Sequence, residues 1–328
     1  METVLFSERI HEEGMKLVEE RYNIRVAPST SEDVLCEEVK DADAMIVRSS
    51  AITAKIIESG ERLKVIGRHG IGVDQIDIDA ATRCKVAVVN TPDANSISVA
   101  EHAVASMLYL CKRLREVDTA LREGVFAQPG SLPGLVTKLG YITSELYSKN
   151  LGLIGFGRIA RLVADICAKG FQMKVFAYDA YIPPETIREY GAEPCASIEE
   201  ILKVGDFVSI HVPLTKETEN LIGAEELALM KPGAFLVNSA RGGLINEEAL
   251  CQALKERQIA GAAVDVYAQE PPDVSNPLFG LDNLLVTPHI AAMTDGALLR
   301  MATDVATEVI TVLEGKRPRY LVNPDVWE

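Results

Sequence analysis

Residues 149–169 read KNLGLIGFGRIARLVADICAK, and this stretch decides the fold. An apolar run that predicts a buried strand is followed at once by a run whose apolar residues have helical spacing. Between the two lie Gly155, Phe156, Gly157, Arg158, Ile159 and Ala160. This G-x-G-x-x-A order is a variant of the dinucleotide-binding fingerprint, in which the first glycine makes a tight turn and the second lets the backbone approach a pyrophosphate. The helix N-terminus then offers N–H groups and the positive end of its dipole to the phosphates.

The next predicted strand, KVFAYD, ends at Asp179. A carboxylate at this position accepts hydrogen bonds from the adenosine ribose and repels a 2′-phosphate, which favours NAD over NADP. A lone glycine fingerprint is a weak signal, but here strand, turn, helix and acid follow one another in the order that the motif requires. We therefore predict NAD as the cofactor, with Gly155, Gly157, Arg158, Ile159 and Asp179 among its contacts.

Strands and helical stretches alternate along nearly the whole chain. The predicted strands are TVLFS, AMIVRS, LKVIGR, VAVVN, NLGLIG, KVFAYD, FVSIHV, AFLVNS, AGAAVDV and LLVTPH. Such alternation indicates βαβ units, and continuous apolar runs are typical of parallel strands buried on both faces. The fold class is therefore α/β. With 328 residues, the chain is long enough for about two domains.

Two helices and one loop stand out from this alternation. A single long helix is expected from Ser98 to about residue 124, because Ser98 and Glu101 have the spacing of a capping box. Its first half is apolar on several faces, which predicts burial between domains or subunits. The Gly- and Pro-rich residues 125–149 that follow predict a long loop. A last helix is expected from Thr294 to a stop at Gly315.

The composition excludes several kinds of partner. There are 33 Lys and Arg residues against 48 Asp and Glu residues, a net charge of −15, and no compact basic run, so we expect no nucleic-acid partner. The six cysteines include no Cys-x-x-Cys pair, which is typical of free thiols in a reducing compartment. The acidic N-terminus does not resemble a signal peptide, and no run approaches the roughly 20 apolar residues of a membrane span. We predict a cytoplasmic protein without a membrane partner.

Polar side chains follow several of the predicted strands. His211 follows FVSI, Arg241 follows AFLVNSA, Asp265 follows AGAAV and His289 follows LLVTP, with Glu270 a short way past Asp265. In an open parallel sheet, ligands bind beyond the carboxyl ends of the strands. These side chains are therefore predicted to share one rim of the sheet.

Five motifs together resemble a known family. They are NSARGG at 238–243, DVYAQEP at 265–271, TPHI at 287–290, GIGVD at 70–74 and NTPDANS at 90–96. In this order they are similar to the signatures of the D-isomer-specific 2-hydroxyacid dehydrogenases, over nearly the whole chain. The closest resemblance is to short phosphoglycerate dehydrogenases that lack a C-terminal regulatory domain.

The resemblance implies a role for each catalytic residue. His289 would be the general acid and base, which suits imidazole because its ordinary pKa lies near neutrality. Glu270 would orient the His289 ring and favour its charged form. Arg241 would hold the substrate carboxylate and polarise the 2-oxo group. No metal is expected, because the arginine and the imidazolium supply the electrophilic stabilisation.

The resemblance also implies binding residues. The further cofactor contacts would be His211, Pro213, Thr218, Ala240 and Asp265, with Asp265 bonding the nicotinamide carboxamide. The substrate contacts would be Arg48, Gly70, Ile71 and Arg241. We hypothesise that Arg48, together with Arg68 and His69, accommodates a second anionic group such as a phosphate or a sulfonate. His102, within the predicted long helix, is interpreted as a packing or interface residue.

The predicted architecture follows the family. We expect two doubly wound parallel-sheet, Rossmann-like domains with a cleft between them: a discontinuous, flavodoxin-like substrate domain of residues 1–98 plus 293–328, and an NAD-binding domain of residues 99–292. We also expect a homodimer formed largely through the long helix. The loop between Gly124 and Lys149 is longer than is usual in phosphoglycerate dehydrogenases, and this weakens transfer of substrate identity.

Two alternative functions remain open. The first is an NAD-sensing scaffold of the C-terminal-binding-protein corepressor type, which shares this fold and triad, although no peptide-docking extension is visible here. The second is an enzyme of different specificity on the same fold. The Glu270–His289 pair argues against a formate dehydrogenase, which generally has Gln in the Glu role, whereas a phosphite dehydrogenase is not excluded by these residues. Hydroxypyruvate, glyoxylate, 3-phosphoglycerate and sulfolactate are all consistent with the predicted site.

Overall fold

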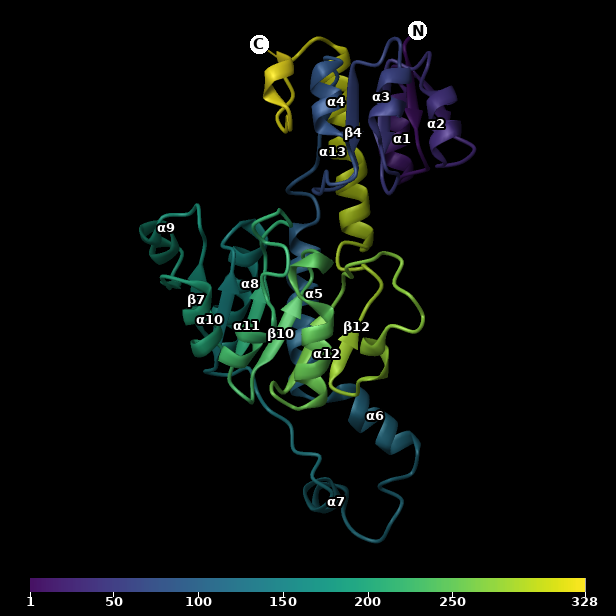
Figure 1. Ribbon diagram of the computed structural model, residues 1–328. Helices are drawn as coiled ribbons and strands as arrows, with labels where there is room; N and C mark the ends of the chain where they lie inside the picture. The colour runs from purple at the N-terminus through teal and green to yellow at the C-terminus, as the bar shows by residue number, and fades with distance from the viewer. Residues whose placement is uncertain (328) are drawn as a thin grey trace. The chain divides into compact units, whose positions relative to one another are not determined.

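The computed structural model describes residues 1–327 and divides into two compact units. Unit 1 comprises Met1–Ser98 and Ala292–Glu328, and unit 2 comprises Val99–Ala291. Each unit contains one parallel sheet with helices on both faces (Figure 1). The predicted fold class, two parallel-sheet α/β domains, is confirmed.

Unit 1 has a five-stranded parallel sheet with the order β2-β1-β3-β4-β5. The strands are β1 (Thr3–Phe6), β2 (Asn23–Val26), β3 (Ala44–Val47), β4 (Val65–Arg68) and β5 (Ala87–Val89). This is the flavodoxin-like order, in which the chain changes direction across the sheet between its first and third strands. The carboxyl ends of β3 and β4 therefore lie side by side, which places Arg48 near the Arg68–Gly70 segment.

The helices of unit 1 bury both faces of this sheet. One face packs against α2 (Glu32–Glu38), α3 (Ala54–Ser59) and α4 (Ile78–Arg83), and the other against α1 (Glu12–Glu19) and α13 (Asp295–Leu313). Helix α13 lies so close to β4 that a Cβ on Gly67 would be 2.5 Å from a Val309 side-chain carbon. The prediction that the last helix starts after Thr294 and stops at Gly315 is confirmed, because Thr294 is the N-cap and Gly315 has φ +73°.

Unit 2 has a seven-stranded parallel sheet with the order β12-β11-β10-β9-β6-β7-β8. The strands are β6 (Asn150–Ile154), β7 (Lys174–Tyr178), β8 (Glu193–Pro194), β9 (Phe207–Ile210), β10 (Phe235–Asn238), β11 (Gly261–Val264) and β12 (Leu284–Val286). The chain builds one half of the sheet outward from β6 and the other half outward from β9. The switch point between these two strands is the place where dinucleotides bind in such folds.

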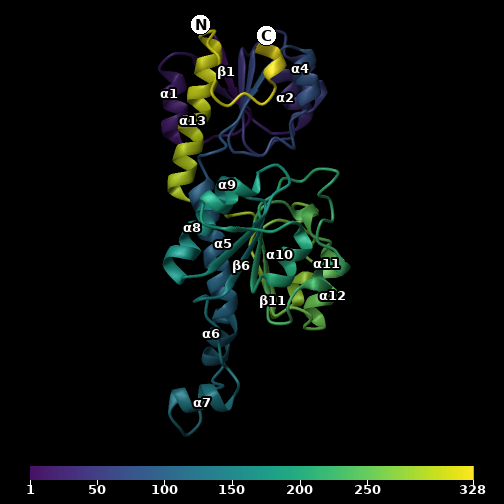
Figure 2. The same cartoon turned by 90° about the vertical axis from the view of Figure 1, so that its left-hand side faces the viewer.

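The helices of unit 2 also cover both faces of the sheet (Figure 2). One face packs against α5 (Ser96–Cys111), whose first residues belong to unit 1, α8 (Arg158–Phe171) and α9 (Pro184–Glu189), and the other against α10 (Ile198–Val204), α11 (Ala224–Leu229) and α12 (Glu247–Lys255). Short 3-10 turns are η1 (Gly242–Leu244) and η2 (Pro277–Gly280) in unit 2 and η3 (Pro324–Trp327) in unit 1. Asn246 caps α12 by accepting a hydrogen bond from Ala249 N, as expected for this residue type.

The prediction of one long helix is wrong. Helix α5 ends at Cys111, and a second helix, α6 (Leu114–Arg122), begins after Arg113, which has the left-handed φ of +50°. The predicted capping box is also wrong, since α5 starts at Ser96. The Ser98 side chain instead lies 2.7 Å from Thr294 Oγ1.

The predicted long loop contains an additional helix, α7 (Leu132–Lys138), capped by Ser131. Helices α6 and α7 extend away from the sheet of unit 2 (Figures 1 and 2). They are held by a small cluster of their own in which Phe126, Leu135 and Ala120 are buried. The Phe126 and Tyr141 rings lie 5.1 Å apart in this cluster.

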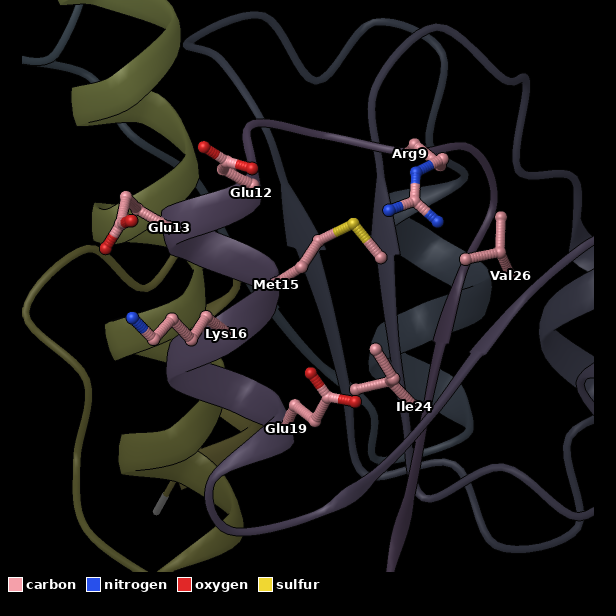
Figure 3. A pocket seen from close by; sticks show the side chains of 8 residues that line it. All are labelled: Arg9, Glu12, Glu13, Met15, Lys16, Glu19, Ile24 and Val26. Carbon is pink, nitrogen blue, oxygen red and sulfur yellow. The ribbon is translucent and has the colours of Figure 1, made fainter.

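Each of the ten predicted strands is present, and two further strands lie at sheet edges. The missed strands are β2, which reads NIRV, and β8, which has two residues. Beside β2, a hollow of about 630 Å³ opens on the surface between this strand and α1 (Figure 3). Its lining includes Arg9, Glu12 and Lys16 and no predicted site residue. No helix among residues 1–327 has the length and apolar character that a bilayer span needs.

Candidate active site

The predicted site residues of unit 2 follow six neighbouring strands of one sheet. In spatial order from β12 to β7, the residues that come after the strand ends are His289, Asp265, Arg241, His211, Gly155 and Asp179. Because all six strands are parallel, these residues lie along a single rim. His289 lies at one end of the rim, Asp179 lies at the other, and the glycine turn lies between them.

The glycine turn has the geometry that a dinucleotide requires. Gly155 has φ +89°, and a Cβ there would be 2.8 Å from the carbonyl oxygen of His211, so no larger side chain fits. Gly157 is the N-cap of α8, and a Cβ there would meet no atom within 4 Å, so the space in front of the helix is open. Ala160 is fully buried where α8 meets the sheet. The first N–H groups of this 14-residue helix therefore face an open cradle that fits a pyrophosphate.

Asp179 is tied to the glycine turn through its carboxylate. Phe156 N donates a 2.7 Å hydrogen bond to Asp179 Oδ2, while Tyr181 N and Ile182 N donate to Oδ1 at 2.8 and 3.0 Å. These bonds fix the carboxylate beside the turn at the end of β7. Each carboxylate oxygen has two lone pairs, so Asp179 Oδ2 can still accept one hydrogen bond from a ribose hydroxyl.

His289 and Glu270 form a pair. His289 Nδ1 lies 2.7 Å from Glu270 Oε2, and Glu270 Oε1 accepts a 3.1 Å hydrogen bond from Tyr267 N. The carboxylate is an acceptor, so Nδ1 carries the proton in this pair. Nε2 is the ring nitrogen that remains available to another partner. The His289 side chain is 51% exposed, and its backbone has the left-handed φ of +54°. Residues with a Cβ rarely adopt this conformation, and it persists only where surrounding contacts enforce it.

Asp265 holds that loop in place. Its carboxylate is 1% exposed and accepts hydrogen bonds from Thr287 Oγ1 at 2.6 Å, Ile290 N at 2.9 Å and Ala291 N at 2.9 Å. The carbonyl oxygen of Asp265 accepts a further bond, at 2.8 Å, from His289 N. The structure therefore brings Asp265 and His289 together, with Asp265 as the anchor of residues 287–291.

Arg241 lies in a segment that contacts the backbone of Tyr267, shortly before Glu270. Asn238, buried at the end of β10, donates from Nδ2 to the carbonyl oxygen of Arg241 at 2.8 Å and accepts from Ala240 N at 3.0 Å. Arg241 Nη1 donates to the carbonyl oxygen of Ala240 at 2.7 Å. The next residue, Gly242, packs so closely on the Tyr267 backbone that a Cβ would be 1.9 Å from its carbonyl carbon. The Arg241 segment is thus in contact with the segment that leads to Glu270.

His211, Pro213 and Thr218 lie beyond the end of β9. Thr218 Oγ1 donates to the carbonyl oxygen of Pro213 at 2.7 Å, which joins two of the predicted cofactor contacts. His211 N donates to Ile154 O at 2.7 Å, next to the glycine turn. Burial lowers the pKa of His211 to about 4, so this ring is neutral at physiological pH. A neutral imidazole suits contact with an uncharged ribose.

The predicted substrate contacts Arg48, Gly70 and Ile71 lie in unit 1. Gly70 has φ +135°, and its N–H faces Thr91 Oγ1 at 3.0 Å. Ile71 is 39% exposed. Arg48 Nη2 lies 3.4 Å from Met293 Sδ, so this side chain rests against the segment before α13.

Arg68 and His69 stand between these substrate contacts. Arg68 donates to the carbonyl oxygens of Gly72 at 2.8 Å and His69 at 2.6 Å, which shapes the turn around Gly70. His69 is buried, with only 3% of its surface exposed. Burial, aided by the positive charges of Arg48 and Arg68, lowers the pKa of His69 to about 4. The two arginines therefore supply the positive charge of this cluster.

Sequence reasoning missed the residues that hold the site together. Tyr267 donates from its hydroxyl to the carbonyl oxygen of Thr287 at 3.0 Å, and burial raises its pKa to about 12, so it remains a donor. His102, interpreted from the sequence as a packing or interface residue, lies with Nε2 3.3 Å from Thr287 Oγ1. Tyr267 and Thr287 are part of the family-like motifs, but nothing in those motifs indicated a structural role.

The chain is similar to several known proteins. The family model described as D-isomer specific 2-hydroxyacid dehydrogenase, NAD binding domain, matches residues 104–291. A D-3-phosphoglycerate dehydrogenase of Methanocaldococcus jannaschii is 43% identical over 98% of this chain and 60% of that protein. A glyoxylate reductase of Thermococcus onnurineus is 39% identical over 98% of this chain and 96% of that protein. The solved structure of D-lactate dehydrogenase from Aquifex aeolicus, complexed with NAD and lactic acid, has a TM-score of 0.84 and 28% identity, over 98% of this chain and 99% of that one.

The fold and the rim define a dinucleotide-binding α/β protein. More specifically, the chain belongs to the D-isomer specific 2-hydroxyacid dehydrogenase family and carries the NAD-binding domain of that family. The family resemblance and the NAD cofactor predicted from the sequence are thereby confirmed. The chain spans 58–60% of the length of the phosphoglycerate dehydrogenases that it matches first.

Proposed function

We propose that this chain transfers a hydride between NAD(H) and a small D-2-hydroxy acid or the corresponding 2-oxo acid. The observation that carries the proposal is the His289–Glu270 pair, which directs one ring nitrogen to the carboxylate and leaves Nε2 for proton transfer. Arg241 follows the strand two places along the same sheet. An acid, an anion-binding arginine and a nucleotide cradle on one rim are the groups that reduction of a 2-oxo acid needs.

When bound, NADH supplies the hydride that reaches the carbonyl carbon. His289 donates the proton from Nε2 to the carbonyl oxygen during reduction and takes it back during oxidation. Glu270 accepts from Nδ1, which fixes the tautomer and the orientation of the ring. Arg241 binds the substrate carboxylate with its planar guanidinium and stabilises charge that develops on the oxygen.

The cofactor contacts are proposed on the same rim. Asp179 accepts from the adenosine ribose and disfavours a 2′-phosphate, so the enzyme uses NAD rather than NADP. The other proposed contacts are Gly155, Gly157, Arg158, Ile159, His211, Pro213, Thr218, Ala240 and Asp265. For Asp265, contact with the nicotinamide carboxamide would be made in addition to its bonds to the loop at 287–291.

We propose that unit 1 is the substrate domain and unit 2 the NAD-binding domain. The segment of Gly70 and Ile71 would hold the substrate carboxylate, with the Ile71 N–H as the donor, because the Gly70 N–H donates to Thr91 Oγ1. Arg48, with Arg68 behind the Gly70 turn, would bind a second anionic group of the substrate. This favours acids that carry a phosphate or a sulfonate besides the carboxylate.

The function is tested by measuring NADH oxidation with two groups of 2-oxo acids. Glyoxylate and hydroxypyruvate carry only the carboxylate, whereas phosphohydroxypyruvate and sulfopyruvate also carry a second anionic group. We expect turnover with NADH and far less with NADPH. Arg48→Ala should raise KM for the preferred dianionic acid about 10–100-fold, because a charge-assisted hydrogen bond is worth about 1.5–3 kcal/mol. KM for glyoxylate should change little.

Arg83→Ala, at an exposed arginine of unit 1, is the matched control for this series. Tight NADH binding without turnover of any acid would contradict the enzymatic proposal and favour a scaffold. Equal effects of Arg48→Ala on mono- and dianionic acids would contradict the second anion site.

We also propose that the protein is a cytoplasmic homodimer. Cys111, Cys167 and Cys251 are buried free thiols, as in proteins from reducing compartments. The segment of residues 114–142, which includes α6 and α7, exposes apolar side chains, among them Leu121 at 59% and Ile142 at 67%. In the proposed dimer, a second copy of this chain would cover both these side chains and α5.

The dimer is tested by sedimentation equilibrium. We expect a mass of twice 35.7 kDa for the wild type and of one chain for Leu121→Asp combined with Ile142→Asp. Val274→Asp changes another exposed apolar residue, 94% exposed and outside this segment, and should leave the mass unchanged. A monomeric wild type at micromolar concentration would contradict the proposal, as would a double variant that remains dimeric.

A further inference from the structure

His102 connects helix α5 to the loop that carries His289. Its ring is 19% exposed, with Nε2 3.3 Å from Thr287 Oγ1 and 3.9 Å from Asp265 Oδ1. Thr287 begins the loop, and Asp265 accepts hydrogen bonds from three groups within it. His102 thus lies in contact with the anchor of the loop.

The protons of this network can be assigned from donor and acceptor chemistry. An ionised carboxylate only accepts, so the single Thr287 hydroxyl proton points to Asp265 Oδ1, 2.6 Å away. The Thr287 oxygen then has only lone pairs to offer to its second neighbour. His102 Nε2 must therefore carry a proton and donate it to Thr287 Oγ1. The resulting chain runs from His102 through Thr287 to Asp265.

The chain of bonds acts on a buried charge. Asp265 is 1% exposed, and among residues 1–327 His102 is the one side chain able to carry positive charge that lies within 4.0 Å of its carboxylate. A buried carboxylate is stable only when its oxygens are well supplied with donors. Hydrogen bonds in series polarise one another, so a donor to Thr287 strengthens the bond from Thr287 to Asp265.

The loop needs this support because its central residue is strained. His289 has φ +54°, a conformation that residues with a Cβ rarely adopt and that persists only where surrounding contacts enforce it. The enforcing contacts are the bonds from Thr287, His289, Ile290 and Ala291 to Asp265. Weakening them lets the backbone of His289 relax, and its ring then leaves the position opposite Glu270.

We propose that His102 is a positioning residue for the acid–base group: by donating from Nε2 to Thr287 it holds the Asp265 anchor and keeps His289 paired with Glu270. This inference rests on the hydride-transfer function proposed above. His102 does not touch the reacting atoms, so its loss should lower turnover much more than it weakens cofactor binding, to which Asp265 is only one of the proposed contacts.

The kinetic test compares His102→Leu, which removes the donor, with His102→Gln, whose amide places a donor near the position of Nε2. We expect His102→Leu to lower kcat about tenfold, the effect of losing one hydrogen bond that serves a buried group. KM for NADH should stay within about twofold of the wild type, since the glycine turn is untouched. His102→Gln should recover most of the activity.

Thr287→Val provides a second variant that breaks the same chain. If His102 acts through Thr287, the double variant His102→Leu with Thr287→Val should lose no more activity than Thr287→Val alone. Additive losses, a rise in KM for NADH that accounts for the defect, or failure of glutamine to restore kcat would each overturn the proposal.

A second readout does not depend on turnover. The protein has five histidines, so nitrogen NMR of ¹⁵N-histidine-labelled full-length protein can be assigned by single substitutions. In the wild type we expect His102 to carry a proton on Nε2. In His102→Leu we expect the ring resonance of His289 to be shifted from its wild-type position. Inactive wild type with this signature would contradict only the hydride-transfer function. An unprotonated His102 Nε2, or an unchanged His289 resonance, would overturn the positioning role even in an active enzyme.

Discussion

Replacing His289 with asparagine should lower kcat for 2-oxo acid reduction about 10²–10⁴-fold, the usual contribution of a general acid. Asparagine is preferred to alanine because His289 has φ +54°, and asparagine tolerates the left-handed region. The loop bonds to Asp265 come from backbone groups and from Thr287, so they remain. The loss should therefore fall on proton transfer, with the affinity for NADH nearly unchanged.

The pH dependence identifies the group further. Reduction consumes a proton and oxidation releases one, so kcat/KM of the wild type should fall as pH rises for reduction and rise with pH for oxidation. His69 and His211 have pKa values lowered to about 4, so they are neutral on both sides of pH 7 and cannot produce this change. In His289→Asn the dependence should disappear.

His11→Asn is the matched control for this variant. His11 caps helix α1 by accepting from Glu13 N, a role that asparagine also performs, so stability and kcat should be unchanged. Stopped-flow measurement of NADH oxidation separates the chemical step from product release. Wild-type kcat in His289→Asn, or the same pH dependence as the wild type, would show that another group supplies the proton.

The rim of the site was predictable because parallel strands end at a common edge. His211, Arg241, Asp265 and His289 each follow a continuous apolar run, and this placed them together without knowledge of the strand order. The pairing of His289 with Glu270 followed from the family resemblance, since local patterns carry no information on which carboxylate meets which ring.

The remaining features depend on contacts that leave little local signal. Strand β2 reads NIRV and lies at an edge, where a half-exposed arginine is allowed. The break between α5 and α6 falls at Arg113, whose backbone is left-handed although no glycine or proline there indicates a break. His102 and Thr287 are 185 positions apart, and their contact exists only because α5 packs beside the end of β12. Periodicity indicates which residues are buried, but not which polar atoms meet.

Gly242→Ala should disrupt the site from a position that carries no side chain. An alanine Cβ would lie 1.9 Å from the carbonyl carbon, 2.0 Å from the carbonyl oxygen of Tyr267 and 2.5 Å from Ala268 N. These are backbone atoms, so no rotation of a side chain relieves the overlap. The Arg241 segment and the Tyr267 segment must move apart, and Tyr267 N is the donor that holds Glu270 Oε1.

The expected result is a combined loss of activity and stability. Misplacement by about an ångström at a catalytic group costs roughly 10²-fold in rate, and forced overpacking costs about 1–3 kcal/mol or more of unfolding free energy. Urea unfolding and kcat/KM measure the two effects. NADH affinity should suffer less than kcat, because Gly155 and Gly157 lie on the other half of the sheet.

Gly243→Ala isolates the cause. It makes the same change one residue later, but its Cβ would meet Leu214 side-chain carbons at 3.2 and 3.3 Å, which can give way. Both variants lose the same backbone freedom in the unfolded chain, so the difference between them measures the clash with Tyr267. Equal stability and equal kcat/KM in the two variants would mean that the contact between the Arg241 and Glu270 segments is not needed to assemble the site. A large deficit confined to Gly242→Ala would mean that the arginine and the His289–Glu270 pair are positioned through this backbone contact, and that activity requires a glycine after Arg241.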